Sequence, residues 1–272
     1  MGRHNRPAPS AFPGAAAATD AEVLGLAPVE ASARPDVTAR LRAAVLSESK
    51  PHPDASGPVG VASDAVQVDT DASDAELLAS LVELVPDALT RHRRLGIPGD
   101  VTRATLLDVG RKHRLYGAAN VLDWLLEILR GDVVELGRLQ VSRRRERYGH
   151  AVHIPELGPL DPGAVDRSIA RIAAFTRADR LQCTSWLLDP VLQAELPDSN
   201  IAAFARRFQL VDHVEPSAEA SAEASRFVFR ESAERVRDAD AVQPRTRLER
   251  VVAERLRTGS DWSEPTGILE LR

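Results

Sequence analysis

Residues 149–175, GHAVHIPELGPLDPGAVDRSIARIAAF, decide the fold of this chain. HAVHIPEL predicts a strand, and the glycines and prolines that follow it predict a turn. Asp161 is expected to cap the next helix, with Pro162 as its first residue. One side of that helix is apolar at helical spacing, through Val165, Ile169, Ile172 and Phe175. A strand, a turn and a helix in this order indicate a mixed α/β unit.

The residues before this unit predict an all-helical segment. Leucines and valines recur at helical spacing over four ranges: 35–48, 74–92, 100–109 and 117–130. Pro86 lies inside the second range and is expected to kink that helix, while Gly131 is expected to end the last one. The Pro/Ala-rich N-terminus predicts a disordered tail over 1–34, and the small polar residues of 49–72 predict a flexible loop.

The pattern changes at Gly131. DVVELGRLQVSRR and HAVHIPEL predict two strands of an antiparallel hairpin, joined by RERYG. Further elements are expected downstream of the helix at Asp161: a buried strand in LQCTSWLLDP, a helix in SNIAAFARRF, strands in QLVDHVE and RFVFR joined by a PSAEASAEAS loop, and a helix over 246–257. The predicted fold class is α+β, with a helical N-terminal domain over 35–130 and a mixed α/β domain over 131–272 around a mostly antiparallel sheet.

Composition excludes several classes of protein. The formal net charge of the 272 residues is −5, which does not favour a nucleic-acid or membrane-surface partner. No stretch approaches the roughly 20 apolar residues of a membrane span. The single cysteine, Cys183, allows no internal disulfide and no cysteine-based metal site. We therefore expect a cytoplasmic protein that uses no metal.

The turn ELGPLDPG has two interpretations. A helix start exposes unpaired N–H groups, and Gly158 and Gly163 let a ligand approach the backbone, so a phosphate could bind there. Glycine and proline also punctuate ordinary turns, and Asp161 and Asp166 already place negative charge at this point. The arginines of 143–147 have the same ambiguity, because they could reach a phosphate or form a solvated hairpin tip.

Candidate catalytic groups are few. Glu135, His153 and Glu156 lie near the hairpin and could act as general bases. His150 and His153 are three residues apart on a strand, so they face opposite sides and do not share a metal. Ser185 is a further candidate nucleophile, although no G-x-S-x-G motif surrounds it.

Five blocks resemble one known family in their order along the chain: ELGRLQVSRR, HIPELGPLDP, SWLLDP, SNIAAFARRF and RFVF. Together they resemble the bacterial GNAT-like acyltransferases, over about residues 75–267. In that family a helical N-terminal domain precedes a GNAT-like C-terminal domain. The resemblance implies that HAVHIP is the strand that splays from QCTSWLL to admit the pantetheine arm of acyl-CoA or acetyl-CoA.

The resemblance also implies a set of binding residues. The strand end and the turn would bind the cofactor through Ile154, Pro155, Gly158, Pro159, Leu160 and Gly163, and Asn200 would contact the pantetheine. Three positions depart from the family. Phe204 and Phe208 occupy the helix that often carries a catalytic tyrosine, and Thr184 stands where a histidine often precedes SWLL.

Three functions remain open at this point. The resemblance favours an acyltransferase that moves an acyl group from acyl-CoA to an amine on a small molecule or peptide, with Glu135, His153, Glu156 or Ser185 in catalysis. The missing tyrosine favours a non-catalytic binding or regulatory module on the same scaffold. A nucleic-acid partner at the 143–147 tip is disfavoured by the acidic net charge.

Overall fold

The computed structural model describes residues 19–47, 71–211 and 214–271. The helical part consists of α1 (Asp20–Val23), α2 (Pro35–Leu46), α3 (Asp74–Val82), α4 (Val85–Arg94), α5 (Gly99–Tyr116), the short 3-10 helix η1 (Ala119–Val121) and α6 (Leu122–Arg130). Its core is made of aliphatic side chains from every one of the α-helices, including the fully buried Leu41, Leu81 and Leu125. Gly131 ends α6 in the left-handed conformation, as its position predicts.

Two expectations for this part were wrong. Pro86 does not kink one long helix: the helix divides at Glu83 and Leu84, and proline lies in the first turn of α4, where its missing N–H costs nothing. The expected disordered tail also ends earlier than residue 34. Thr19 and Glu22 form a capping box for α1, and Leu24 is completely buried among the other helices. Residues 1–18 and most of the expected 49–72 loop lie outside the described residues.

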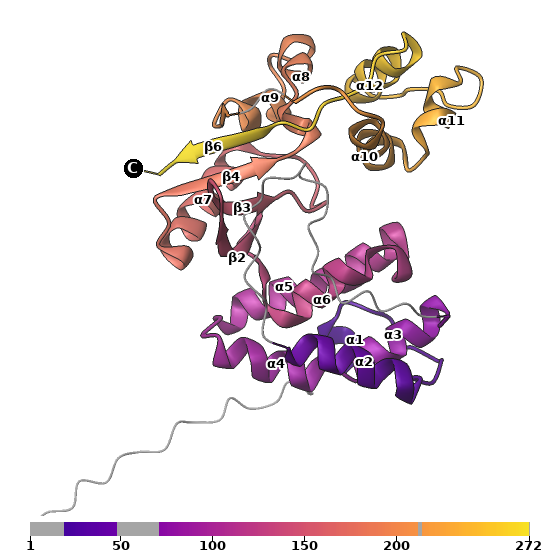
Figure 1. The fold of residues 1–272 in the computed structure, drawn as a ribbon, viewed down its shortest axis with the longest axis vertical. Coiled ribbons are helices and arrows are strands. Elements are labelled where there is room, and N and C mark those ends of the chain that lie inside the picture. The colour runs from indigo at the N-terminus through magenta and orange to yellow at the C-terminus, as the bar shows by residue number, and fades with distance from the viewer. Residues whose placement is uncertain (1–18, 48–70, 212–213, 272) are drawn as a thin grey trace, which may run out of the picture.

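A six-stranded sheet forms the other part (Figure 1). Its strands are β1 (Val133–Glu135), β2 (Gln140–Glu146), β3 (Gly149–His153), β4 (Arg180–Thr184), β5 (Gln209–Leu210) and β6 (Thr266–Glu270), in the order β1-β2-β3-β4-β6-β5. Among the strand pairs of the described residues only β3–β4 is parallel, which confirms the α+β class with a mostly antiparallel sheet. The first expected strand is two strands, because Gly137 turns the chain at a φ of +93°.

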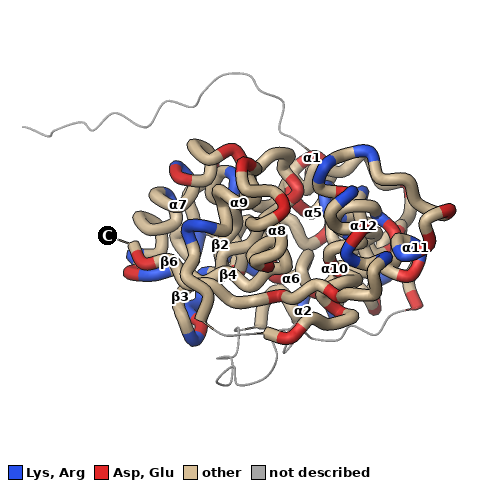
Figure 2. The backbone as a smooth tube through the Cα atoms, turned by 90° about the horizontal axis from the view of Figure 1, so that it is seen from above, with Lys and Arg blue, Asp and Glu red and all other residues tan. Residues whose placement is uncertain are grey.

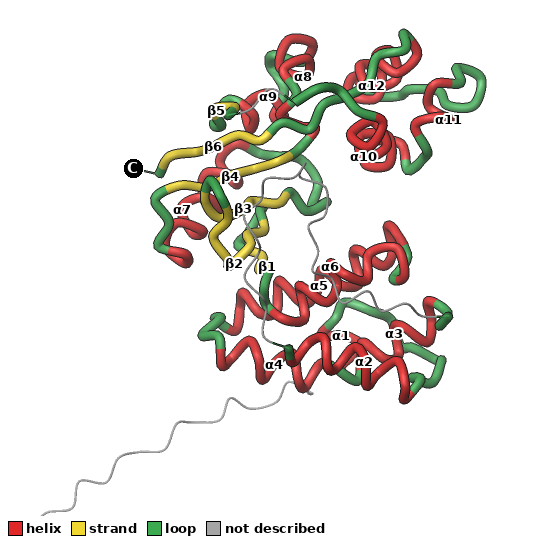
Figure 3. The backbone as a smooth tube through the Cα atoms, viewed as in Figure 1, coloured by secondary structure: helices red, strands yellow, loops and turns green. Residues whose placement is uncertain are grey.

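Helices lie around the sheet, and the last three of them form a group beyond one end of it (Figure 3). The helices are α7 (Pro162–Thr176), the 3-10 helix η2 (Trp186–Leu188), α8 (Pro190–Glu195), α9 (Asn200–Ala205), α10 (Ala218–Phe229), α11 (Ala233–Arg237) and α12 (Arg247–Arg257). The expected PSAEASAEAS loop and RFVFR strand are in fact one helix, α10. Ser217 caps it, and Ala220 and Ala224 are buried on its inner face, so small residues serve close packing rather than a loop. The strand β6 was not predicted.

The helical part and the sheet are joined through buried polar groups. On α5, Arg111 donates to Asp108 at 2.8 Å and also to Glu135 on β1. Gln140 on β2 donates to Asp108 at 2.8 Å, and the amide of Glu135 donates to Thr105 at 2.9 Å. Because these groups are largely buried and bonded to one another, they fix the position of α5 against the sheet.

Close backbone packing of α1 on α5 yields a first prediction. The amide of Gly110 donates to the carbonyl of Leu24 at 2.8 Å, and an alanine Cβ at position 110 would lie 2.2 Å from the Gly25 carbonyl oxygen. We expect Gly110→Ala to lower the free energy of unfolding by about 1–3 kcal/mol, because the two backbones must separate. Thermal denaturation measures this. Gly99→Ala, also in α5 but with open space at its Cβ, is the control and should not destabilise.

Candidate functional site

The parallel strands β3 and β4 separate towards their C-terminal ends. They pair at His150–Leu181 and Ala151–Gln182, and within the described chain no β3–β4 pair follows. Strand β4 remains paired with β6 on its other side as far as Thr184. The last residues of β3 therefore have backbone groups free on the side of β4, which is the splay that the family resemblance implies.

Arg138 holds the turn that follows β3. Its guanidinium is buried and donates to three carbonyl oxygens, those of Pro155 at 2.8 Å, Gly158 at 2.7 Å and Pro159 at 2.9 Å. Its own amide donates to Ser168 of α7 at 2.7 Å. A planar, permanently charged fork suits this task, because it can satisfy several carbonyls in fixed directions. Sequence reasoning missed Arg138, since nothing in the local pattern distinguishes a buried arginine from a solvated one.

Charged residues of both signs lie on either side of the first turn of α7. Asp161 caps the helix by accepting from the Ala164 amide at 2.8 Å. Asp166 is paired with Arg207 at 2.6 Å, so its charge opposes an anion less than the sequence suggests. Gly158 has a φ of +79°, and no atom lies within 4 Å of the place where a Cβ would be, so its backbone is open to approach. Arg167 is exposed one helical turn further on, and no carboxylate of the described residues pairs with it.

Glu156 is brought together with residues from distant parts of the chain. Tyr116, at the end of α5, donates its hydroxyl proton to Oε1, and Arg230, just after α10, donates to the same oxygen at 2.9 Å. The side chain is about 10% exposed, and Oε2 is buried without a hydrogen-bond partner among the described residues. Burial and the adjacent carboxylate raise the pKa of Tyr116 well above its usual value, so the phenol keeps its proton. One carboxylate oxygen is thus fixed and the other is unoccupied.

His153, the last residue of β3, faces the helical part. Its Nε2 lies 2.8 Å from the Ser142 hydroxyl, and its ring meets Trp124 of α6 edge-on with centroids 4.8 Å apart. Burial, together with the ammonium of Lys112, lowers the pKa of His153 to about 4. The Lys112 ammonium lies over the rings of Tyr116 and Trp124, 5.4 and 5.8 Å from their centroids. His153 is therefore neutral at neutral pH.

The other predicted site residues lie apart from Glu156. Glu135 belongs to the buried network of Arg111 and Gln140, two strands from β3, and burial raises its pKa to about 7. Ser185 follows β4 and accepts from the Leu187 amide at 3.1 Å, which caps η2. Asn200 is exposed in the first turn of α9, beside α7. Their catalytic or binding roles remain predictions.

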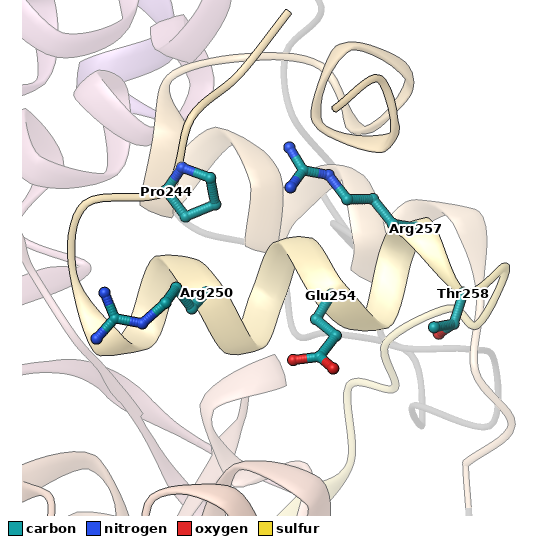
Figure 4. A pocket seen from close by; sticks show the side chains of 5 residues that line it. All are labelled: Pro244, Arg250, Glu254, Arg257 and Thr258. Carbon is teal, nitrogen blue, oxygen red and sulfur yellow. The ribbon is translucent and has the colours of Figure 1, made fainter. Parts of the chain in front are cut away.

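Elsewhere the surface offers little that resembles a second site. Basic and acidic residues are intermixed along the backbone in the view of Figure 2. A depression of about 440 Å³ lies on α12, lined by Pro244, Arg250, Glu254, Arg257 and Thr258 (Figure 4). Arg257 is bonded there to the carbonyls of Val236 and Val242, which is a structural role. In the described ranges no three His, Cys, Asp or Glu side chains are grouped to hold a metal, and no helix has the length and apolarity to span a membrane.

Comparison with known families decides the assignment. The model of the N-acyltransferase N-terminal domain matches residues 12–131, and that of the GNAT-like C-terminal domain matches residues 133–269. This chain belongs to the GNAT-like N-acyltransferase family. The resemblance found in the sequence is thereby confirmed. A search of curated proteins finds no match.

Solved structures agree with this family. The crystal structure of an acyltransferase in complex with decanoyl-CoA and teicoplanin is similar at a TM-score of 0.65 and 33% identity, over 72% of this chain and 66% of that chain. An acyltransferase in complex with decanoyl-CoA is similar at a TM-score of 0.63 and 30% identity, over 72% and 65%. The chain therefore spans slightly less than two thirds of the length of each of these proteins.

The turn held by Arg138 yields a second prediction. We expect Arg138→Met to lower the free energy of unfolding by at least about 2 kcal/mol, because three carbonyls lose a charged donor. Amide hydrogen exchange should also quicken at Leu157, whose N–H donates to Pro155 at 2.8 Å. The matched variant Arg145→Met removes an exposed pair with Asp179 and should change stability by less than about 0.5 kcal/mol. Equal effects of the two variants would contradict the role given to Arg138.

Proposed function

We propose that this protein transfers an acyl group from acyl-CoA to an amine. The observation that carries the proposal is the separation of β3 and β4, which continues into a turn fixed by Arg138 and then into α7. Membership of the family and the acyl-CoA bound by the similar acyltransferases support the same donor. No step of this reaction needs a metal.

The donor lies in the splay in this proposal. Ile154 and Pro155 flank the pantetheine arm. The pyrophosphate meets the backbone of the turn from Gly158 to Gly163, which includes Pro159 and Leu160, at the positive end of the α7 dipole. Arg167 adds a cation there that the sequence analysis did not consider. Asn200 stands beside α7 on α9 as a further contact for the pantetheine.

The reaction itself follows from the open backbone of β3. N–H groups that β4 leaves unpaired polarise the thioester carbonyl, and the amine nitrogen attacks its carbon. A C–N bond forms, the C–S bond breaks, and CoA leaves as a thiolate that takes up one proton. Glu156 orients the amine, because its buried Oε2 lacks a donor while Tyr116 and Arg230 fix Oε1. His153 is the weaker candidate for a catalytic base. A group whose pKa is about 4 is too weak a base to take a proton efficiently from an amine at neutral pH.

The acceptor is proposed only by class. One similar structure contains teicoplanin, but an identity of 33% does not carry that acceptor to this chain. We propose an amine-bearing small molecule or peptide. The division into domains at about residue 131 and a cytoplasmic location are parts of the same proposal, the second resting on the single cysteine.

The second candidate function is a non-catalytic acyl-CoA-binding module. It is favoured by α9, where Phe204 is completely buried and no tyrosine is available to protonate the thiolate. Acyl-CoA binding without transfer to any amine would select this alternative over the enzyme.

Thermal denaturation with decanoyl-CoA, acetyl-CoA and free CoA tests the donor site. A ligand at about 100 times its Kd stabilises the folded protein by about 2.7 kcal/mol. In a protein of this size that raises Tm by about 5–10 °C. We expect such a rise with acyl-CoA, and the chain length with the largest rise identifies the preferred donor. Absence of a rise with all three would contradict both the enzyme and the module.

Glu156→Gln tests the acceptor side. We expect the variant to bind decanoyl-CoA as well as the unmodified protein does, while kcat/KM for the amine falls about 10- to 100-fold, because a charge-assisted hydrogen bond is lost. Glu254→Gln, on α12, is the control and should change neither quantity. An unchanged kcat/KM in Glu156→Gln would remove Glu156 from the proposed mechanism.

A further inference from the structure

Glu264 lies at the point where β4 ends, and the sequence analysis did not consider it. The residues on both sides of it are anchored there. Ser263 donates through its amide and its hydroxyl to Asp189, at 2.9 and 2.7 Å, and the carbonyl of Pro265 accepts from the Ser185 amide at 3.3 Å. The next residue, Thr266, pairs with Thr184, the last residue of β4. Glu264 is therefore held beside the end of β4, on the side of β6, rather than on a loose loop.

The carboxylate of Glu264 is half-buried, yet none of the described residues gives it a hydrogen bond or an ion pair. Glu135 and Glu156, by contrast, are both bound by an arginine. The titratable groups that face Glu264 are Glu223 of α10, itself paired with Arg226, and the thiol of Cys183 on β4. A partly desolvated carboxylate without a partner does not stabilise a fold. Glu127 is in the same state but lies on α6, so it is the place of Glu264 at the end of β4 that points to a chemical use.

Its surroundings suit proton transfer at neutral pH. Burial, with a smaller contribution from Glu223, raises the pKa of Glu264 to about 7. Burial, with a smaller contribution from Glu264, raises the pKa of Cys183 to about 12, so the thiol stays protonated and is not a competing base. A general base works best when its pKa lies near the working pH. Glu156 differs, because Tyr116 and Arg230 both donate to its Oε1, whereas no described residue donates to the Glu264 carboxylate.

We propose that Glu264 is the catalytic base that removes the proton of the acceptor ammonium, while Glu156 orients the amine. This inference rests on the proposed acyl transfer. The ammonium gives one proton to the Glu264 carboxylate and becomes a neutral amine. The amine forms the C–N bond, the C–S bond breaks with its electron pair on sulfur, and the second nitrogen proton goes to the thiolate. The products are the amide, CoA as a thiol, and a protonated Glu264 that returns its proton to water.

The test is the pH dependence of kcat/KM, measured with decanoyl-CoA and with glucosamine, glycinamide and water as acceptors. Below about pH 7 we expect the rate of the unmodified protein to fall tenfold per unit, because the base becomes protonated. We call this fall the acid limb of the pH profile. In Glu264→Gln the limb should be absent and kcat should be at least about 100-fold lower, while the Kd for decanoyl-CoA is unchanged. Glu264→Asp should regain part of the rate. An acceptor amine that titrates in the same pH range adds a second limb to the profile. The position of that limb changes with the pKa of the amine, and the limb is still present in Glu264→Gln.

Glu127→Gln is the matched control. Glu127 is another half-buried carboxylate whose pKa burial raises to about 7, but it lies on α6, so its variant should keep both the rate and the limb. Retention of rate and limb in Glu264→Gln would overturn this inference and leave the proposed function intact. Binding of decanoyl-CoA by the unmodified protein, without transfer to any of the three acceptors, would overturn the proposed function and this inference with it.

Discussion

The guanidinium of Arg138 is the interaction on which the site depends. It comes from the turn between β1 and β2, yet it fixes the carbonyls of the segment between β3 and α7. Through this one side chain the direction of β3, the position of Glu156 and the first turn of α7 are set together. A charge without a carboxylate partner is costly to bury, and three carbonyl dipoles offset that cost only in the folded geometry. The turn is therefore defined only when the hairpin is formed.

The proposed acceptor side depends on a second set of contacts. Asp108 and Arg111 hold α5 against the sheet through Glu135 and Gln140, and this position brings Tyr116 to Glu156. Glu135 can thus influence the site without touching a substrate. The helices of the N-terminal part are not only a support, because one of them supplies a hydroxyl to the proposed site.

The sequence predicts the local features better than the long-range ones. Asp161, Pro162 and Gly131 have the cap positions that their residue types favour, because a cap is decided within one turn of helix. The segment of α10 was predicted to be a loop and a strand, because its alanines and serines resemble a low-complexity sequence. In the structure these small residues form the buried face of the helix. Arg138, Tyr116 and Glu264 escaped notice for a different reason. Their partners or neighbours at the site lie at least 17 residues away, and no pattern in one sequence reveals such contacts.

The hydrogen bonds to Glu156 have a further consequence for how such a protein can diversify. The proposed donor side uses residues of the sheet, the turn and α7, which follow one another in the chain. The acceptor side borrows Tyr116 from α5 and Arg230 from beyond α10, so it is assembled from three separated segments. Under the proposed function, substitutions in α5 or α10 would change which acceptor binds while the residues that bind the thioester stay the same. One scaffold would then serve many amines by exchanging only the residues that contact the acceptor.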